Sequence, residues 1–155
     1  MKWRSGMRPP GAEAERAFAR VLAFLATLVI AGCATSYNYA YDPTTRFAEL
    51  KSYAWATPQP YSLLETNVRF IADPLLEQKG FTKATDKPDF VIAVVYANEL
   101  FSQGYELQTL TLKVYRVSDQ IPLWQGTASG SISTDANSKD LRKAVETTLA
   151  TFPPK

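Results

Sequence analysis

The sequence predicts an α+β fold: a two-layer sandwich in which a mostly antiparallel sheet of four to five strands has two helices packed on one face. Three observations lead to this prediction. Two short alternating segments come first, apolar residues at helical spacing recur in the middle and at the end, and three strand-like segments lie between those stretches. A sheet covered on one face by helices is the usual outcome of this order.

The first two strands are short and aromatic. Residues 37–41, Tyr-Asn-Tyr-Ala-Tyr, alternate strictly, so their three tyrosines share one face of a strand. The Asp-Pro turn signal at 42–45 ends this strand, and residues 53–55, Tyr-Ala-Trp, form the second. Such rings can form a platform that stacks on sugars, although cross-strand packing against a core is their commoner use. The residues concerned are Tyr37, Tyr39, Tyr41, Tyr53 and Trp55.

Two helices are predicted, over 61–80 and 137–152. Pro74 interrupts the first one, and a proline inside a helix costs about 3 kcal/mol because it removes a hydrogen bond. Asp73-Pro74 also has the form of an N-cap followed by a first helical residue. We therefore expect a kinked helix or two abutting helices. The apolar stripes are Leu64, Val68, Ile71 and Leu75 in the first helix, and Leu141, Val145, Leu149 and Phe152 in the second.

Three strands are predicted between the helices, over 90–97, 105–117 and 121–132. The first is continuously apolar, which is typical of a strand at the centre of a sheet. On the last strand, alternate positions hold three small residues between two large ones, and this trough should receive a helix. The face consists of Trp124, Gly126, Ala128, Gly130 and Ile132.

A loop is expected at 98–104, between the first and second of these strands. It contains Leu100 and Phe101 beside a glycine, and these two side chains are the best local candidates for contact with a partner. The alternative is that the loop turns both apolar side chains inward.

The N-terminal segment resembles an export signal. Basic residues extend to Arg20, and the uncharged stretch 21–32 is shorter than the about 20 apolar residues that span a membrane. Residues 30–33, Ile-Ala-Gly-Cys, resemble the bacterial lipoprotein box. That resemblance implies cleavage between Gly32 and Cys33, a diacylglycerol on the Cys33 thiol and an N-acyl lipid on the new amine. The alternatives are a plain secretory signal that leaves Cys33 free, or an amphipathic anchor.

These features divide the chain into three parts. Residues 1–32 are expected to be a lipoprotein signal peptide that is removed, with Met1 or Met7 as its true start. Residues 33–36 are the lipidated cysteine and a short tether, and residues 37–155 form a single periplasmic α+β domain.

The tether indicates where this domain works. Lipoproteins retained in the inner membrane commonly carry Asp in the place of Ala34, so the expected location is the periplasmic face of the outer membrane, with the inner membrane as the alternative. Between Cys33 and Tyr37 the extended chain reaches roughly 10 to 14 Å, which places the domain against the membrane surface.

Charge and composition exclude several classes of protein. The formal net charge of +2 comes from the first 32 residues, since the remainder carries twelve basic and thirteen acidic residues. A near-neutral body does not attract phosphates, so nucleic-acid binding is not expected. One cysteine and no histidine allow neither an internal disulfide nor a zinc site of the usual kinds. We therefore expect no metal and no cofactor besides the covalent lipid.

No arrangement of residues predicts an enzyme. The candidate acids are Asp42, Asp89, Glu99 and Glu106. No spacing among them argues for the paired carboxyls of a glycosidase, roughly 5 to 10 Å apart. We interpret Asp42 as a turn acceptor and Asp89 as a solvated residue at the start of a strand. No histidine or Ser-x-x-Lys motif is present to activate a serine.

Several short motifs, taken in order, resemble one family. They are Tyr41-Asp42-Pro43, Phe47, Tyr53-Ala54-Trp55, Leu76 to Phe81, Asp89-Phe90, Leu123-Trp124-Gln125-Gly126, Ala128, Gly130 and Phe152-Pro153-Pro154. The chain resembles the bacterial lipoproteins grouped as domain-of-unknown-function family 4136, although Pro74 departs from the uninterrupted helix usual in that family. The resemblance implies an anchored envelope protein with a small α+β domain, and it carries over no catalytic residue.

The expected function is that of a membrane-anchored periplasmic lipoprotein, acting as a non-enzymatic binding or structural accessory module of the cell envelope. Its expected partners are the membrane, through the lipid anchor, and envelope proteins or peptidoglycan. One alternative is an auxiliary lipoprotein of an envelope transport assembly, and another is a carboxylate-dependent glycan hydrolase. The sequence predicts no oligomeric state.

Overall fold

The structure is a computed structural model that describes residues 35–57, 62–101, 104–135 and 137–154, with the backbone alone for 98–101 and 104–106. The chain divides into two units, Met1–Ala34 and Thr35–Lys155, and everything described below belongs to the second. The predicted cleavage site at Gly32 and Cys33 therefore lies outside the described residues. The elements are β1 (Ser36–Tyr41), the short 3-10 helix η1 (Phe47–Glu49), β2 (Ser52–Trp55), α2 (Leu63–Gln78), β3 (Thr82–Lys83), β4 (Phe90–Phe101), β5 (Gly104–Arg116), β6 (Pro122–Ser133) and α3 (Lys139–Ala150).

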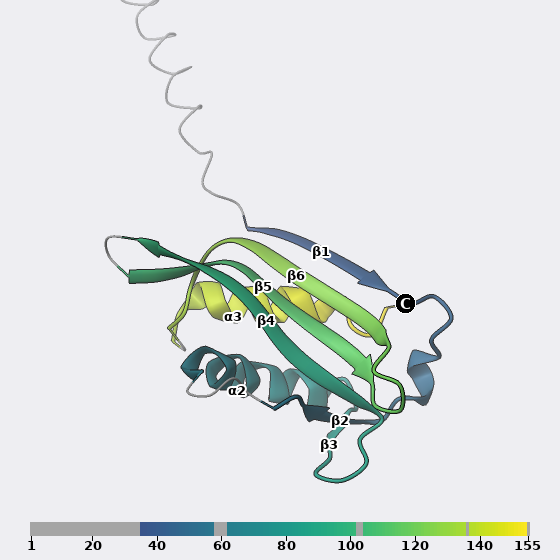
Figure 1. Cartoon of the computed structure of the whole chain (residues 1–155). Coiled ribbons are helices and arrows are strands. Elements are labelled where there is room, and N and C mark those ends of the chain that lie inside the picture. Colours follow the sequence, from purple (N-terminus) through teal and green to yellow (C-terminus); the bar gives the residue numbers. More distant parts are fainter. Residues whose placement is uncertain (1–34, 58–61, 102–103, 136, 155) are drawn as a thin grey trace, which may run out of the picture. The chain divides into compact units, whose positions relative to one another are not determined.

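The α+β class with two helices is confirmed, but the sheet differs in detail from the prediction. It has six strands in the order β1-β6-β5-β4-β2-β3, and it is mixed, because β2 runs parallel to both β3 and β4. The parallel pairing follows from α2, which connects β2 to β3 and carries the chain back to the end of the sheet where β2 began, so that β3 and β4 both run in the direction of β2. Figure 1 shows both helices on the same face of the sheet.

The strand that the prediction lacked is β3. It consists of two residues, Thr82 and Lys83, and a segment this short has no alternation from which to recognise it. It pairs with the outer side of β2 and forms one edge of the sheet. The other edge is β1, which pairs antiparallel with β6 and not with the neighbouring segment in sequence.

The first helix is a single element, although Pro74 lies inside it. Ser62 caps it by accepting a hydrogen bond from the Glu65 backbone N–H at 3.2 Å. The expectation of two abutting helices is therefore wrong. Asp73 is not an N-cap, because its side chain turns instead to β2 and β3.

The trough on β6 receives α3 at Gly126, as predicted, whereas Gly130, which the prediction placed in the same trough, lies against Thr35. A Cβ on Gly126 would lie 2.6 Å from the Trp124 ring and 2.7 Å from the Thr148 Cγ2 of α3. The apolar stripes of both helices are buried against the sheet, and Phe152 packs among four other aromatic rings at the end of α3.

The expectation of a loop over 98–104 is wrong. Strand β4 continues to Phe101 and β5 begins at Gly104, so Leu100 and Phe101 lie in a β-ladder. A β-bulge between Ala97 and Asn98 shifts the register, and the antiparallel pairing then continues to the pair Phe101 and Gly104. Polar residues and a glycine suggested a loop, but the inter-strand hydrogen bonds extend beyond the apolar run.

No helix among the described residues has the length and apolar composition needed to cross a bilayer.

Candidate functional site

The chain enters the folded domain at Thr35, whose backbone packs directly on β6. A Cβ on Gly130 would lie 3.2 Å from the Thr35 Cα and 3.3 Å from its Oγ1. Gly130 also has a φ of +146°, a conformation that glycine adopts far more readily than other residues. Close approach and backbone conformation both require glycine here. The second residue after Cys33 therefore already lies against the sheet.

Strand β1 begins directly after Thr35 and carries a pair of exposed tyrosines. The side chain of Tyr39 is 52% exposed and that of Tyr41 is 43% exposed. Their rings are nearly parallel, with an interplanar angle of 14° and a centroid separation of 6.3 Å. We call these two residues the tyrosine strip.

The predicted aromatic platform is thus divided by the structure. Tyr53 is fully buried, and Trp55 and Tyr37 pack partly buried against the core, as the core interpretation expected. Tyr39 and Tyr41 remain exposed because β1 is an edge strand. Tyr39 lies opposite Gly126, whose missing side chain offers no cross-strand partner.

A surface pocket of about 380 Å³ lies where β1 ends and β6 begins. Its lining includes Tyr41, Asp42 and Gln125. A hydrolase of the glycosidase type would need a second carboxyl, and Asp42 is the one acidic residue in the described lining. The lining residues are Ala40, Tyr41, Asp42, Pro122, Leu123, Trp124 and Gln125.

Asp42 is a turn acceptor, as predicted. Its Oδ1 accepts hydrogen bonds from the Thr44 backbone N–H at 2.9 Å and from the Thr44 hydroxyl at 2.7 Å, and its Oδ2 accepts one from Thr45 Oγ1 at 2.9 Å. These bonds, led by the backbone N–H of Thr44, hold the pKa of Asp42 below its ordinary value. The carboxylate is therefore kept ionised and fixed by its own turn.

Asp89 does more than the sequence suggested. It is exposed at the start of β4, but its Oδ2 accepts hydrogen bonds from the backbone N–H groups of Lys51 and Ser52, each at 2.8 Å. These bonds lower the pKa of Asp89, with Lys51 as the largest cause. The side chain thus ties the beginning of β2 to the beginning of β4.

A polar cluster centred on Asp73 joins α2 to β2 and was not predicted. Asp73 Oδ1 accepts hydrogen bonds from the Tyr53 hydroxyl at 2.8 Å and from Trp55 Nε1 at 2.7 Å. Its Oδ2 lies 2.7 Å from Lys83 Nζ. Burial alone would raise the pKa of Asp73, but the hydrogen bonds from these three side chains outweigh it and lower the pKa. Burial, together with Asp73, raises the pKa of Tyr53.

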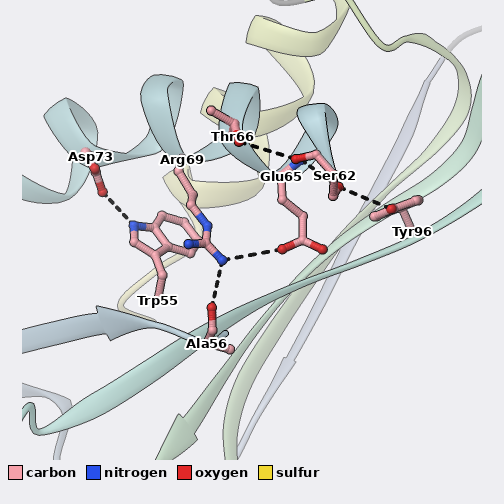
Figure 2. A network of polar contacts seen from close by, with 8 residues as sticks. All are labelled: Trp55, Ala56, Ser62, Glu65, Thr66, Arg69, Asp73 and Tyr96. Carbon is pink, nitrogen blue, oxygen red and sulfur yellow. Dashed lines mark hydrogen bonds and ion pairs between the residues drawn. The ribbon is translucent and has the colours of Figure 1, made fainter. Parts of the chain in front are cut away.

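A second group of polar contacts lies beside this cluster, as Figure 2 shows. The guanidinium of Arg69 donates to the Ala56 carbonyl at 2.7 Å and lies over the Trp55 ring, 5.4 Å from its centroid. It also pairs with the buried Glu65 at 3.4 Å. The spacing of Glu65 and Arg69, four residues apart on a predicted helix, was the available sequence signal for this pair. The contacts of Arg69 hold α2 on the end of β2.

These clusters are suited to holding elements together. The described residues contain no group of three His, Cys, Asp or Glu side chains that could hold a metal ion. Leu100 and Phe101, the predicted partner contacts, have side chains outside the described set, and their role stays a prediction.

Comparison with known proteins gives a family and a fold. A family model described as "Domain of unknown function (DUF4136)" matches residues 37–154. Among solved structures, a DUF4136 family protein from Bacteroides thetaiotaomicron VPI-5482 has a TM-score of 0.59 at 13% identity, over 77% of this chain and 96% of its own. The PelC dodecamer from Paraburkholderia phytofirmans has a TM-score of 0.51 at 13% identity, over 76% of this chain and 96% of its own.

A PDZ domain protein from Parabacteroides distasonis ATCC 8503 has a TM-score of 0.62 at 15% identity, over 88% of this chain. The present chain spans 40% of that protein. Identities this low show a shared fold and nothing more. No curated protein matches the chain.

Proposed function

The chain belongs to the family described as Domain of unknown function (DUF4136), and we propose that it is a membrane-anchored lipoprotein of the bacterial envelope, acting as a non-enzymatic binding or structural accessory module. In this proposal Cys33 carries a diacylglycerol and an N-acyl lipid, and the domain stands at the periplasmic face of the outer membrane. The lipoprotein box at 30–33 and the absence of Asp at Ala34 support it.

The structural observation that carries the proposal is the contact of Thr35 with Gly130. Because Thr35 lies against β6, two residue steps along the chain separate this residue of the domain from Cys33. An extended chain covers at most about 7 Å in two steps. A lipid on Cys33 would therefore keep the domain at the bilayer surface, where its partners would be other envelope components.

The state of three described carboxylates supports a non-enzymatic role, while the side chains of Glu99 and Glu106, the other candidate acids, lie outside the described residues. Asp42, Asp73 and Asp89 each have a lowered pKa and are engaged in hydrogen bonds to their own chain. A general acid needs the opposite shift, because it must keep its proton near neutral pH.

The test is lipid labelling of the Cys33→Ser variant in cells fed labelled palmitate. We expect the wild type to incorporate the label and fractionate with the outer membrane, and the variant to remain unlabelled and either unprocessed or released. Ala34→Asp is the matched control, since it should keep the label and move to the inner membrane. Incorporation of palmitate into Cys33→Ser would overturn the proposal.

An auxiliary role in an envelope transport assembly is the second candidate. The observation that bears on it is the fold shared with the Paraburkholderia phytofirmans protein, which is described as a dodecamer. Such a role would require this chain to assemble as well. Native mass measurement of the detergent-extracted protein distinguishes the two candidates, because this second candidate needs an oligomer and the accessory module does not.

A further inference from the structure

The tyrosine strip lies on an edge strand with unusual chemistry. Strand β1 reads Ser-Tyr-Asn-Tyr-Ala-Tyr and has no charged residue or proline, the devices that commonly protect sheet edges from association. Among the described strands, only β6 pairs with it, so no described strand covers its outer side, and Figure 1 shows it at the margin of the sheet. An uncharged open edge with two exposed rings suits a surface that accepts amphipathic groups.

The position of the strip relative to the anchor is set by chain length. Strand residues rise about 3.3 Å each, which puts Tyr39 about 13 Å and Tyr41 about 20 Å along the strand from Thr35. Thr35 is itself within about 7 Å of Cys33. Of all exposed aromatic groups in the described domain, these two follow the anchor most closely in the chain.

We infer that β1 lies along the bilayer surface and that Tyr39 and Tyr41 rest in the lipid headgroup region, as a second membrane contact beside the lipid on Cys33. Tyrosine suits this position because its ring is apolar and its hydroxyl prefers water, which is why tyrosines gather at membrane interfaces. The nearly parallel rings can enter the same layer together. The hydrated headgroups can also satisfy the free backbone groups of the open edge.

This inference rests on the proposed lipidation, since the lipid is what brings β1 to the bilayer. The more exposed apolar residues of α2, Leu63 at 72% and Phe70 at 74%, are not candidates for this contact. Helix α2 packs on β2, near the opposite edge of the sheet from β1. Leu63 and Phe70 therefore serve as controls, because their side chains are more exposed than those of Tyr39 and Tyr41.

The experiment reconstitutes the membrane-extracted protein into phosphatidylcholine vesicles with and without brominated acyl chains, which quench tryptophan at the membrane. Tyr39→Trp and Tyr41→Trp each place a reporter on the strip, and Phe70→Trp places one on α2. The fluorescence of the unsubstituted protein, which has its own tryptophans, is subtracted. Vesicle flotation is measured on the same samples, and iodide in the buffer reports exposure to water.

We expect the fluorescence added by Tyr39→Trp and Tyr41→Trp to be lost in brominated vesicles and shielded from iodide, while that of Phe70→Trp is unaffected by bromine. Flotation without bromine quenching of the strip would overturn the inference and leave the lipid anchor standing. Shielding from iodide without bromine quenching would also overturn it, because a second copy or a glycan would then cover the strip. Failure to float would overturn both proposals.

Discussion

At the scale of single residues, Asp73 joins α2 to both β2 and β3. One carboxylate on α2 receives the hydroxyl of Tyr53 and the indole N–H of Trp55, which would otherwise be polar groups without partners beneath a helix. Leaving a buried donor unsatisfied costs about 1–3 kcal/mol, which exceeds the net stabilisation from a typical hydrogen bond. The main effect of the carboxylate is therefore to prevent that cost. The exposed Lys83 pair adds little by comparison, because half of that side chain is in water.

Substitution of Asp73 by Asn tests this role. The amide keeps the shape but loses the charge that strengthens both hydrogen bonds, so we expect the free energy of unfolding to fall by about 1–2 kcal/mol, measured by urea denaturation. Asp86→Asn is the control, since Asp86 is exposed, and it should change stability by less than about 0.5 kcal/mol. Equal stability of the two variants would contradict the role given to Asp73.

The same residue predicts a dependence on pH. The folded protein lowers the pKa of Asp73 from its ordinary value of 3.8, so its contribution is complete above about pH 4 and is lost as the pH falls through the folded value. The difference in urea midpoint between wild type and Asp73→Asn should therefore be largest near neutral pH and shrink in acid. If this difference in urea midpoint grew in acid, the pKa of Asp73 would be raised in the folded protein.

At the scale of elements, the packing of α3 on β6 depends on a missing side chain. The ring of Trp124 and the Cγ2 of Thr148 together occupy the space over Gly126. Gly126→Ala would place a methyl group within 2.7 Å of both, so we expect the free energy of unfolding to fall by about 1–3 kcal/mol. Thermal unfolding measures this, with the exposed neighbour Gln125→Ala as a control that should unfold like the wild type. A stabilised Gly126→Ala protein would show that the helix can move aside at no cost.

The elements that the sequence predicts well are those with a periodic pattern on one face. The stripes of both helices and the small residues Gly126 and Ala128 of β6 repeat at fixed spacing, so their burial follows from the chain alone. The parallel direction of β2 does not follow, because a three-residue pattern is the same for either direction and the path of α2 decides it. Strand β3 is too short for any pattern, and β4 passes Asn98 and Glu99 because hydrogen bonding to β5 continues there.

The polar clusters could be predicted only in part, for a physical reason. Glu65 and Arg69 are four residues apart on one helix, so their pairing has a local signal. Asp73 meets residues 53, 55 and 83, which are distant in sequence and come together only after α2 has packed on the sheet. The exposure of Tyr39 and Tyr41 likewise depends on the place of β1 at the edge, which no alternation of residues reveals.

At the scale of the whole molecule, the proposed anchor and the tyrosine strip together define an orientation. A lipid at one point lets a domain turn freely about its tether, whereas a second contact some 20 Å along β1 would hold β1 parallel to the bilayer. Helix α2 and the far edge of the sheet would then be left for partners in the periplasm. Linked contacts of this kind reinforce each other, because the first raises the effective concentration of the second.

The consequence can be tested by lengthening the tether. Ten inserted Gly/Ser residues between Ala34 and Thr35 would extend the flexible reach to roughly 16–19 Å, enough for the domain to leave the surface. If the strip binds headgroups, energy transfer from the tryptophans of the domain to a dansyl-labelled lipid should stay near the wild-type level after insertion alone. It should fall when Tyr39→Ser and Tyr41→Ser are added to the insertion, because neither attachment then holds the domain close.

The matched control combines the insertion with Leu63→Ser and Phe70→Ser, which remove more exposed apolar side chains from α2 and should leave energy transfer unchanged. In the uninserted protein, Tyr39→Ser and Tyr41→Ser should have a small effect, since the two-step tether to Thr35 keeps the domain near the bilayer by itself. The two changes are therefore expected to be strongly non-additive, which is the sign of two linked attachments. If insertion alone abolished the transfer, the lipid on Cys33 would be the sole contact and the orientation of the domain would be free.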